Sequence, residues 1–223
     1  MILRVGLTGG IASGKTSVGR TLAGLGCMVV DADAIVSRLY RPGGAGFDAL
    51  VRAYGKDILR SDGTIDRPKV ASIAFVDDAS AKRLNDLIHP LVIDEEERFI
   101  VSEAQRFPDR DRIVVVEATL LLESGGKQRY DKIVVVDSAP EVQIERAVKR
   151  GMQREDAVRR SERQMKADMR RRQADYIIEN NGDIRALEAE TLRVYEQLRA
   201  DLQEKKKSAA RTLAAPPTKR SKR

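Results

Sequence analysis

The sequence is poor in aromatic residues and in cysteine. Tryptophan is absent, aromatic side chains make up 4% of the 223 residues, and Cys27 is the only cysteine. A lone cysteine cannot form an internal disulfide. Because Cys27 also lies at the edge of an apolar run, we interpret it as a small core residue rather than a nucleophile. We therefore expect a reducing, cytoplasmic setting.

Long hydrophobic runs are missing as well. No uninterrupted apolar stretch approaches the roughly 18 residues that indicate a membrane span, and residues 1–9 lack the basic and apolar regions of a secretory leader. Hydrophobic residues still make up 42% of the chain, so it can bury a core and is neither collagen-like nor mostly disordered. We expect a soluble, unprocessed, monomeric protein with one compact domain over residues 1–204.

The net charge of +7 comes from the C-terminal end. Residues 205–223 contain eight Lys or Arg and no acid; without them the 41 basic residues fall to 33, against 34 acidic ones, a net charge of −1. This segment has too few apolar residues to offset the entropy of ordering, so we predict a disordered tail. A solubilising role is favoured over contact with nucleic acid or a membrane surface.

Five short apolar runs predict the strands of one sheet. The β-branched runs lack polar alternation, which is typical of parallel strands covered on both faces. Segments with helical spacing separate the runs, so we predict an α/β fold in which helices flank a mostly parallel five-stranded sheet. The predicted strands are Ile2–Thr8, Met28–Val30, Ile113–Val116, Ile133–Val136 and Tyr176–Ile178.

The long stretch between the second and third runs predicts a helical insertion over about residues 35–110. Turn signals occur at Arg41–Gly44 and Ser61–Thr64. Helix-like segments follow the turns, and Pro90 is expected to separate the last two. The predicted helices include Phe47–Tyr54, Ala79–Ile88 and Leu91–Ala104.

One loop predicts a nucleoside triphosphate site. Residues 9–16 fit the pattern G-x-x-x-x-G-K-[ST] at every specified position, between an apolar run and a helical segment. Its glycines let the chain wrap a phosphate, so that backbone N–H groups and the helix N-terminus point at the anion. We predict that Lys15 reaches the outer phosphates of ATP and that the Thr16 hydroxyl holds Mg²⁺. The predicted ATP-binding residues are Gly9, Gly10, Ile11, Ala12, Ser13, Gly14, Lys15, Thr16 and Ser17. The G-x-G-x-x-G spacing of dinucleotide sites is absent.

Asp33 is the candidate group for the second substrate. It follows the second predicted strand, and a carboxylate at that strand end would face the crevice that holds the phosphate loop. There it could orient a hydroxyl and accept its proton, mainly through position, since an unperturbed Asp is a weak base. Asp31 is a competing assignment, and either residue could instead cap the helix that follows.

An arginine-rich segment, about residues 145–172, predicts a lid. Phosphoryl transfer needs positive charge on the migrating group, and a mobile helical flap can deliver it while excluding water. Arg146 and Arg150 lie four apart, hence on one helical face, and are favoured as phosphate or substrate ligands. For Arg170–Arg172 a solvated charge run is the preferred interpretation.

Four other residues are weaker candidates. His89, the only histidine, precedes Pro90, and a structural role at a helix end competes with substrate contact. Glu117 and Asp137 each follow a predicted strand and, like Glu123, could assist a metal ion. For all three, a cap or an exposed strand end is an equal alternative.

In these motifs the chain closely resembles the dephospho-coenzyme A kinase family over about residues 1–200. The phosphate loop alone is shared by many nucleotide-binding proteins, so the specificity of the match comes from the other motifs. The matching segments are Gly6–Thr16, Asp31–Asp33, Asp62–Arg67, Leu84-Asn85 with His89-Pro90, Leu120–Gly125, and the series Gln164, Arg170, Ala174-Asp175 and Asn180–Gly182.

The resemblance implies an adenylate-kinase-like fold with a coenzyme-binding insertion and a lid. It implies transfer of the γ-phosphate of MgATP to the ribose 3′-hydroxyl of dephospho-coenzyme A, the last step of coenzyme A synthesis. By position, Asp33 matches the family's proposed base, Lys15 its phosphate-binding lysine, Arg150 its lid arginine, and His89 a motif of its substrate domain. The predicted catalytic residues are thus Asp33, Lys15 and Arg150.

Three residues depart from the family pattern. Ala12 occupies a loop position often filled by glycine, which requires that its φ be negative. Thr119 stands where the family usually has proline, and Ile93 where a basic residue often follows His-Pro. Two alternatives to the predicted reaction are a related small-molecule or nucleotide kinase and a non-catalytic nucleic-acid binder that uses the basic tail.

Overall fold

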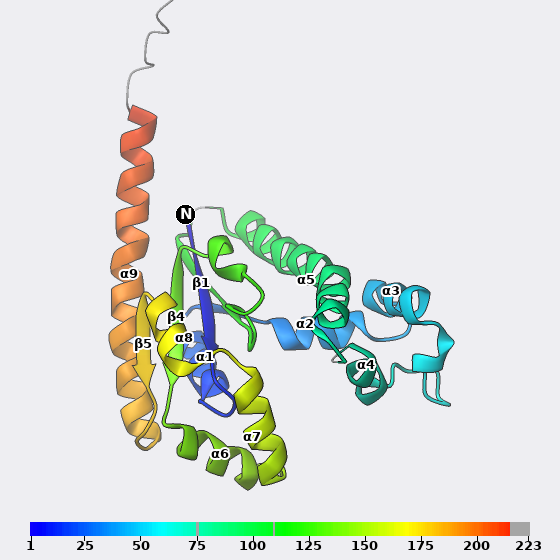
Figure 1. The fold of residues 1–223 in the computed structure, drawn as a ribbon. Coiled ribbons are helices and arrows are strands. Elements are labelled where there is room, and N and C mark those ends of the chain that lie inside the picture. Colours follow the sequence, from blue (N-terminus) through cyan, green and yellow to red (C-terminus); the bar gives the residue numbers. More distant parts are fainter. Residues whose placement is uncertain (75, 109, 215–223) are drawn as a thin grey trace, which may run out of the picture.

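The centre of the molecule is a parallel sheet of five strands (Figure 1). The computed structural model describes residues 1–74, 76–108 and 110–214. The strand order is β2-β3-β1-β4-β5, and every neighbouring pair is parallel. The strands are β1 (Ile2–Gly9), β2 (Met28–Asp31), β3 (Arg112–Glu117), β4 (Lys132–Asp137) and β5 (Tyr176–Glu179). All five predicted strands are confirmed, with each end within one residue.

Helices cover both faces of the sheet, as predicted. On one face, Val18 of α1 and Val194 and Leu198 of α9 are fully buried against β1 and β4. On the other, Ile35 of α2 and Val92 of α5 join the core over β3. The α-helices are α1 (Lys15–Gly24), α2 (Ala32–Leu39), α3 (Ala45–Tyr54), α4 (Arg67–Ala74), α5 (Asp78–Arg106), α6 (Pro140–Lys149), α7 (Arg154–Arg163), α8 (Ala167–Gln173) and α9 (Ile184–Ala214), with short 3₁₀ turns η1 (Lys56–Ile58) and η2 (Gly126–Arg129).

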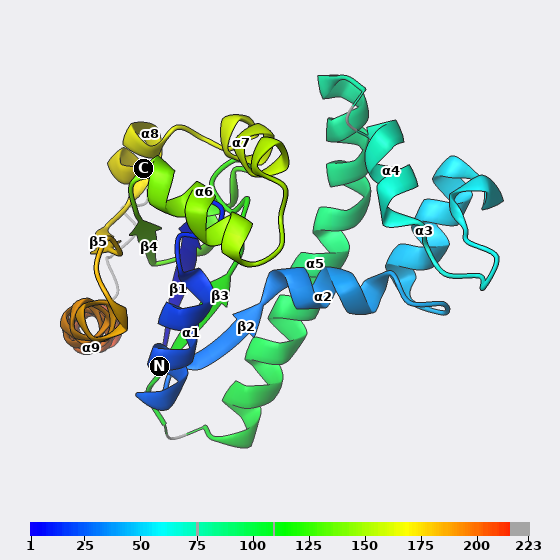
Figure 2. The same ribbon diagram turned by 90° about the horizontal axis from the view of Figure 1, so that it is seen from below.

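The helices α2 to α5 lie between β2 and β3 in the chain and project to one side of the sheet (Figure 2). The prediction that Pro90 separates two helices is wrong, because α5 is one continuous helix with Pro90 inside it. A proline removes one helical hydrogen bond. Ile88 and Val92 are buried on either side of it, so apolar packing holds both halves of α5 in one helix.

The C-terminal helix α9 extends into the segment that was predicted to be disordered. We expected disorder from Lys205 onward, but α9 continues to Ala214, and residues 215–223 lie outside the described part of the chain. The Lys205 Nζ donates to Asp131 at 2.6 Å and to the Ile2 carbonyl at 3.0 Å, and Lys206 binds Asp111 at 2.7 Å. These partners lie far away in the sequence, so the composition of the segment could not indicate them.

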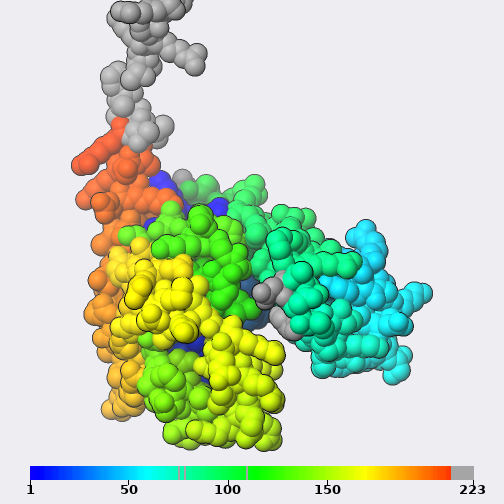
Figure 3. All heavy atoms as spheres, viewed as in Figure 1, coloured from blue at the N-terminus to red at the C-terminus, as the bar shows by residue number. Residues whose placement is uncertain are grey.

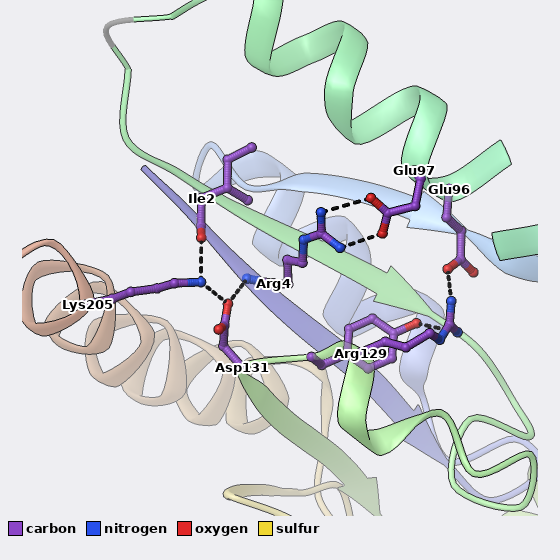
Figure 4. A network of polar contacts seen from close by, with 8 residues as sticks. Ile2, Arg4, Glu96, Glu97, Arg129, Asp131 and Lys205 are labelled. Carbon is purple, nitrogen blue, oxygen red and sulfur yellow. Dashed lines mark hydrogen bonds and ion pairs between the residues drawn. The ribbon is translucent and has the colours of Figure 1, made fainter. Parts of the chain in front are cut away.

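Figure 4 shows a polar network beside the N-terminal half of β1. The Arg4 N–H donates to Asp131 at 2.8 Å, and the Arg4 guanidinium pairs with Glu97 of α5. Arg129 of η2 donates to Glu96, the residue before Glu97 in α5, at 2.7 Å. The network therefore joins α9, β1 and α5.

Among the described helices, none has the length and apolar character needed to cross a membrane.

Candidate active site

The phosphate loop connects β1 to α1 with unusual backbone angles. Gly14 has φ 104° and Ala12 has φ 50°. The expectation of a negative φ at Ala12 is therefore wrong. Left-handed geometry costs an L-residue about 1 kcal/mol, so the loop holds Ala12 in a conformation that glycine would adopt freely.

Lys15 lies folded across this loop. Its Nζ donates to the carbonyl oxygens of Gly9 and Gly10, both at 3.0 Å, and the residue is 9% exposed. Burial lowers the pKa of Lys15, while the carboxylates of Glu117 and Asp33 act in the opposite direction. A desolvated ammonium group with acids nearby is thus held at the mouth of the loop.

Two polar side chains from the far end of the chain hold the loop in shape. The Asn180 Nδ2, just beyond β5, donates to the Ser13 carbonyl at 2.7 Å. The Ile11 N–H donates to the Gln164 Oε1 at 2.8 Å, at the end of α7. A Cβ on Gly14 would lie 2.2 Å from the Asn180 Nδ2, so only glycine allows this close approach.

Asp31 and Asp33 have different roles in the fold. Asp33 follows the second strand, as expected, although not directly: β2 ends at Asp31, and Asp33 lies in the first turn of α2. Asp31 caps that helix, accepting from the Ala34 N–H at 3.0 Å. This leaves Asp33 exposed, with its Oδ2 accepting from the Thr119 hydroxyl at 3.1 Å. Thr119 therefore binds the candidate base directly.

The carboxyl ends of β3 and β4 add acidic groups to the site. The Thr16 hydroxyl donates to the Glu117 Oε1 at 2.9 Å. Burial raises the pKa of Glu117, although the Thr16 hydrogen bond and the Lys15 charge oppose this. Asp137 pairs with Arg171 at 2.7 Å, and the Glu123 Oε1 accepts from the Met165 N–H at 2.9 Å.

A cavity of about 420 Å³ opens beside Asp33. Its walls are mostly apolar and come from α2, from α5 and from the segment after β3. The surface is recessed between α5 and α7 (Figure 3). Burial lowers the pKa of His89, and the Arg129 charge acts in the same direction. The polar lining residues are Asp33, Tyr40, Asn85, His89, Glu96, Thr119, Ser124 and Arg129. His89 thus lies in this cavity, within α5 and not at a helix end, and Ile93 also lines it.

The structure changes the order of the arginine candidates. Arg146 donates to the Asn180 carbonyl at 2.9 Å and to the Gly182 carbonyl at 3.3 Å, so its donors support the loop after β5 rather than the cavity. Arg150 caps α6 and is exposed, and its side chain makes no hydrogen bond or ion pair with the described residues. Arg170 is only 5% exposed, so the interpretation of Arg170–Arg172 as a solvated run is wrong for Arg170, whereas Arg172 is exposed.

The sequence argument missed the roles of Arg170, Gln164 and Asn180. All three belong to the late motifs of the family resemblance, and that resemblance was the available signal. The spacing of these residues gave no signal. Gln164 and Asn180 contact the phosphate loop, which lies far away in the sequence. Arg170 lies in a helix of seven residues, which is too short to show a pattern of buried positions.

Comparisons with known proteins show the family of the chain. A sequence profile described as dephospho-CoA kinase matches residues 3–186. The dephospho-CoA kinase of Aquifex aeolicus is 38% identical over 198 residues, covering 89% of this chain and 98% of that protein. The enzyme of Streptomyces avermitilis is 39% identical over 188 residues, covering 84% and 89%.

Solved structures extend the comparison to the fold. The crystal structure of TT1252 from Thermus thermophilus has a TM-score of 0.74 and 29% identity, covering 88% of this chain and 97% of that one. A shikimate kinase from Acinetobacter baumannii has a TM-score of 0.52 and 16% identity over 90% of this chain and 95% of that one, which is a likeness of fold alone. The fold is thus that of a P-loop kinase, and the chain belongs to the dephospho-CoA kinase family.

Proposed function

We propose that this kinase transfers the γ-phosphate of MgATP to the ribose 3′-hydroxyl of dephospho-coenzyme A, giving coenzyme A and ADP. The observation that carries the proposal is the placement of Asp33. It is close enough to Lys15 to act on the pKa of the lysine, and it also lines the 420 Å³ cavity. A carboxylate between a phosphate loop and an apolar cavity can serve a hydroxyl acceptor held in that cavity.

ATP would bind along residues 9–17, with its phosphates against the backbone N–H groups of the loop. Lys15 would exchange its two carbonyl partners for the outer phosphate oxygens. The exchange is favourable because a buried ammonium gains more from an anion than from two neutral carbonyls. Arg150, at the end of α6, is our candidate for the lid arginine that would bind the phosphates when the lid closes.

Asp33 would accept the proton of the acceptor hydroxyl. The Thr119 hydroxyl occupies its Oδ2, which orients the carboxylate and leaves the Oδ1 for the substrate. A phosphate acceptor, as in a nucleoside monophosphate kinase, would be repelled by the same charge. The apolar wall formed by α2 and α5 suits the nucleoside of dephospho-coenzyme A, and Asn85 and His89 offer hydrogen bonds to it.

The donor set around Thr16 fits a magnesium ion. Thr16 and Glu117 present hydroxyl and carboxylate oxygens 2.9 Å apart at the start of α1, the oxygen chemistry that Mg²⁺ prefers. These two residues would hold the ion, which would neutralise phosphate charge.

The proposal includes a cytoplasmic, monomeric protein. In its support, Cys27 is buried, and burial raises the pKa of its thiol to about 12, which leaves it unreactive.

Acceptor choice tests the proposal. ATP consumption with Mg²⁺ is measured in parallel on dephospho-coenzyme A, adenosine and nucleoside monophosphates, and NMR locates the new phosphate on the product. We expect turnover on dephospho-coenzyme A with the phosphate on the 3′-oxygen. Turnover on a monophosphate, and none on dephospho-coenzyme A, would refute the proposed acceptor while leaving the kinase fold intact.

A further inference from the structure

Arg170 is a buried cation with unused donors. It lies in α8, which packs beside β4 (Figure 2), and it is the single buried residue of that helix. Its Nη2 donates to the Met165 carbonyl at 2.7 Å. Its Nε and Nη1 are buried and have no hydrogen-bond partner within the described residues. Buried donors are nearly always paired, so these two N–H groups point to an acceptor that the chain does not supply.

The acids near Arg170 are already engaged. Burial lowers the pKa of Arg170, and the charges of Glu123 and Asp137 oppose this without hydrogen-bonding to it. The Glu123 Oε1 accepts from the Met165 N–H, and the Asp137 Oδ2 accepts from Arg171. A guanidinium held this way is desolvated and only partly compensated, which is costly unless an anion completes the site.

Arg170 is close enough to Lys15 for their charges to interact. Its charge lowers the pKa of the lysine, so the two cations are near each other, and Glu123 acts on both. The next residues after Glu123, Ser124 and Gly125, line the acceptor cavity. Arg170 therefore lies near the lysine that is expected to meet the outer phosphates, and the segment that carries Glu123 continues into the acceptor cavity. The phosphoryl group would pass between that lysine and that cavity.

We propose that Arg170 is a further catalytic residue, whose Nε–H and Nη1–H donate to non-bridging oxygens of the γ-phosphoryl group during transfer. This rests on the proposed function. In the step, the bond from the γ-phosphorus to the β,γ-bridging oxygen breaks and its electron pair leaves with ADP. The acceptor oxygen bonds to the phosphorus, and its proton passes to Asp33. Arg170 remains protonated and binds the equatorial oxygens, which carry the charge of the transition state.

A purely structural role of Arg170 predicts a different effect of its substitution. If Arg170 only held the turn at Met165, its Nη2 would suffice, and a variant would lose stability without favouring one nucleotide complex over another. A catalytic role predicts selective loss of the complex that mimics transfer. MgADP with aluminium fluoride is such a mimic, because the aluminium fluoride occupies the position of the migrating phosphoryl group.

The test compares Arg170→Gln with Arg172→Gln. Arg172 lies in the same helix, is exposed, and pairs with Asp168 at 3.8 Å, so it controls for loss of an α8 arginine. We expect Arg170→Gln to lower kcat by about 10²–10³-fold, with Arg172→Gln within about threefold of the wild type. Arg170→Gln should weaken binding of MgADP–aluminium fluoride with dephospho-coenzyme A by a similar factor, but weaken binding of MgADP alone by less than about threefold.

Two further measurements keep the proposal falsifiable if the glutamine variant does not fold. Arg170→Lys keeps the charge and loses the fork of donors, so we expect at least about a tenfold loss of kcat. A crystal structure of the wild-type complex with MgADP, aluminium fluoride and dephospho-coenzyme A should place Nε or Nη1 about 3 Å from a fluoride. A kcat for folded Arg170→Gln within about threefold of the wild type, or equal weakening of both complexes, would overturn the assignment. So would a guanidinium that does not touch the fluoride.

These outcomes are separable from failure of the proposed function. If the wild type phosphorylates another acceptor and not dephospho-coenzyme A, the proposed function fails. The Arg170 comparison then uses that acceptor and still decides whether the guanidinium binds the phosphoryl group.

Discussion

The phosphate loop and the acceptor cavity are built in different ways. The loop is held by hydrogen bonds from Asn180 and Gln164 and by Lys15 folded over it. The cavity has mostly apolar walls from α2 and α5, with a few polar groups such as Asn85 and His89. A phosphate needs fixed donors in one arrangement, whereas a nucleoside acceptor gains most from buried apolar surface. Asp33 is the residue that both regions share.

Removal of Lys15 should have the largest effect on the polar region. We expect Lys15→Ala to lower kcat/KM by about 10³-fold or more, because it removes the charge nearest the outer phosphates. Steady-state assays on MgATP and dephospho-coenzyme A measure this. The acceptor cavity should be unaffected, so binding of dephospho-coenzyme A alone, measured by calorimetry, is the control. Full activity in Lys15→Ala would contradict the loop assignment.

Removal of Asn180 should loosen the loop without touching its charge. Asn180→Ala deletes the donor to the Ser13 carbonyl and leaves the half-buried Arg146 without one acceptor. We expect the free energy of unfolding to fall by about 1–3 kcal/mol and KM for MgATP to rise about tenfold. Asn181→Ala is the matched control, since Asn181 is exposed and binds only the Ala139 N–H, at 2.8 Å, within the described residues. Equal effects in the two variants would contradict the supporting role of Asn180.

The strained residue of the loop gives a smaller effect of opposite sign. Ala12→Gly should raise the free energy of unfolding by about 0.5–1 kcal/mol, because glycine adopts φ 50° without the penalty that alanine carries. Denaturant unfolding measures the change. Gly14→Ala, in the same loop, should destabilise through its clash with Asn180. A less stable Ala12→Gly variant would show that the loop does not strain this residue.

The smallest expected effect concerns the apolar cavity and is the pH dependence of stability that His89 contributes. Burial in the cavity wall lowers its pKa below the ordinary 6.5, so the unfolded chain binds the proton first as the pH falls. Stability should therefore decrease as the pH falls through the window below about 6.5, and His89→Gln should lack this part of the decrease. Because His89 is the only histidine, one NMR resonance reports its titration. A midpoint at or above 6.5 would contradict the burial.

The two regions also differ in how far the sequence predicts them. The loop is a contiguous motif in which each residue type has its own expected task, so an ATP-binding role for Gly9 to Ser17 could be predicted from the sequence. The five strands were equally clear, because a parallel sheet buries both faces of each strand and leaves uniform apolar runs. Local patterns of this kind carry their own explanation.

Features set by distant partners could not be predicted in this way. The helix through Pro90 depends on apolar contacts on either side of it, and the ordered Lys205 and Lys206 depend on Asp131 and Asp111. Arg170 stands in a run of three arginines, and one short helix gives no period from which to tell the buried one. The family resemblance pointed to Asp33 rather than Asp31, and the structure adds that the Asp31 carboxylate is engaged as the cap of α2.

The shared position of Asp33 is the central claim, and single-turnover transfer in Asp33→Asn tests it most directly. The variant keeps the size of the side chain and removes the proton acceptor. With saturating MgATP and dephospho-coenzyme A, we expect transfer to slow by about 10²–10⁴-fold while the Kd for MgATP stays within about threefold. Asp31→Asn, which weakens only the helix cap, should transfer at a rate within about tenfold of the wild type. Transfer by Asp33→Asn at the wild-type rate would contradict the account.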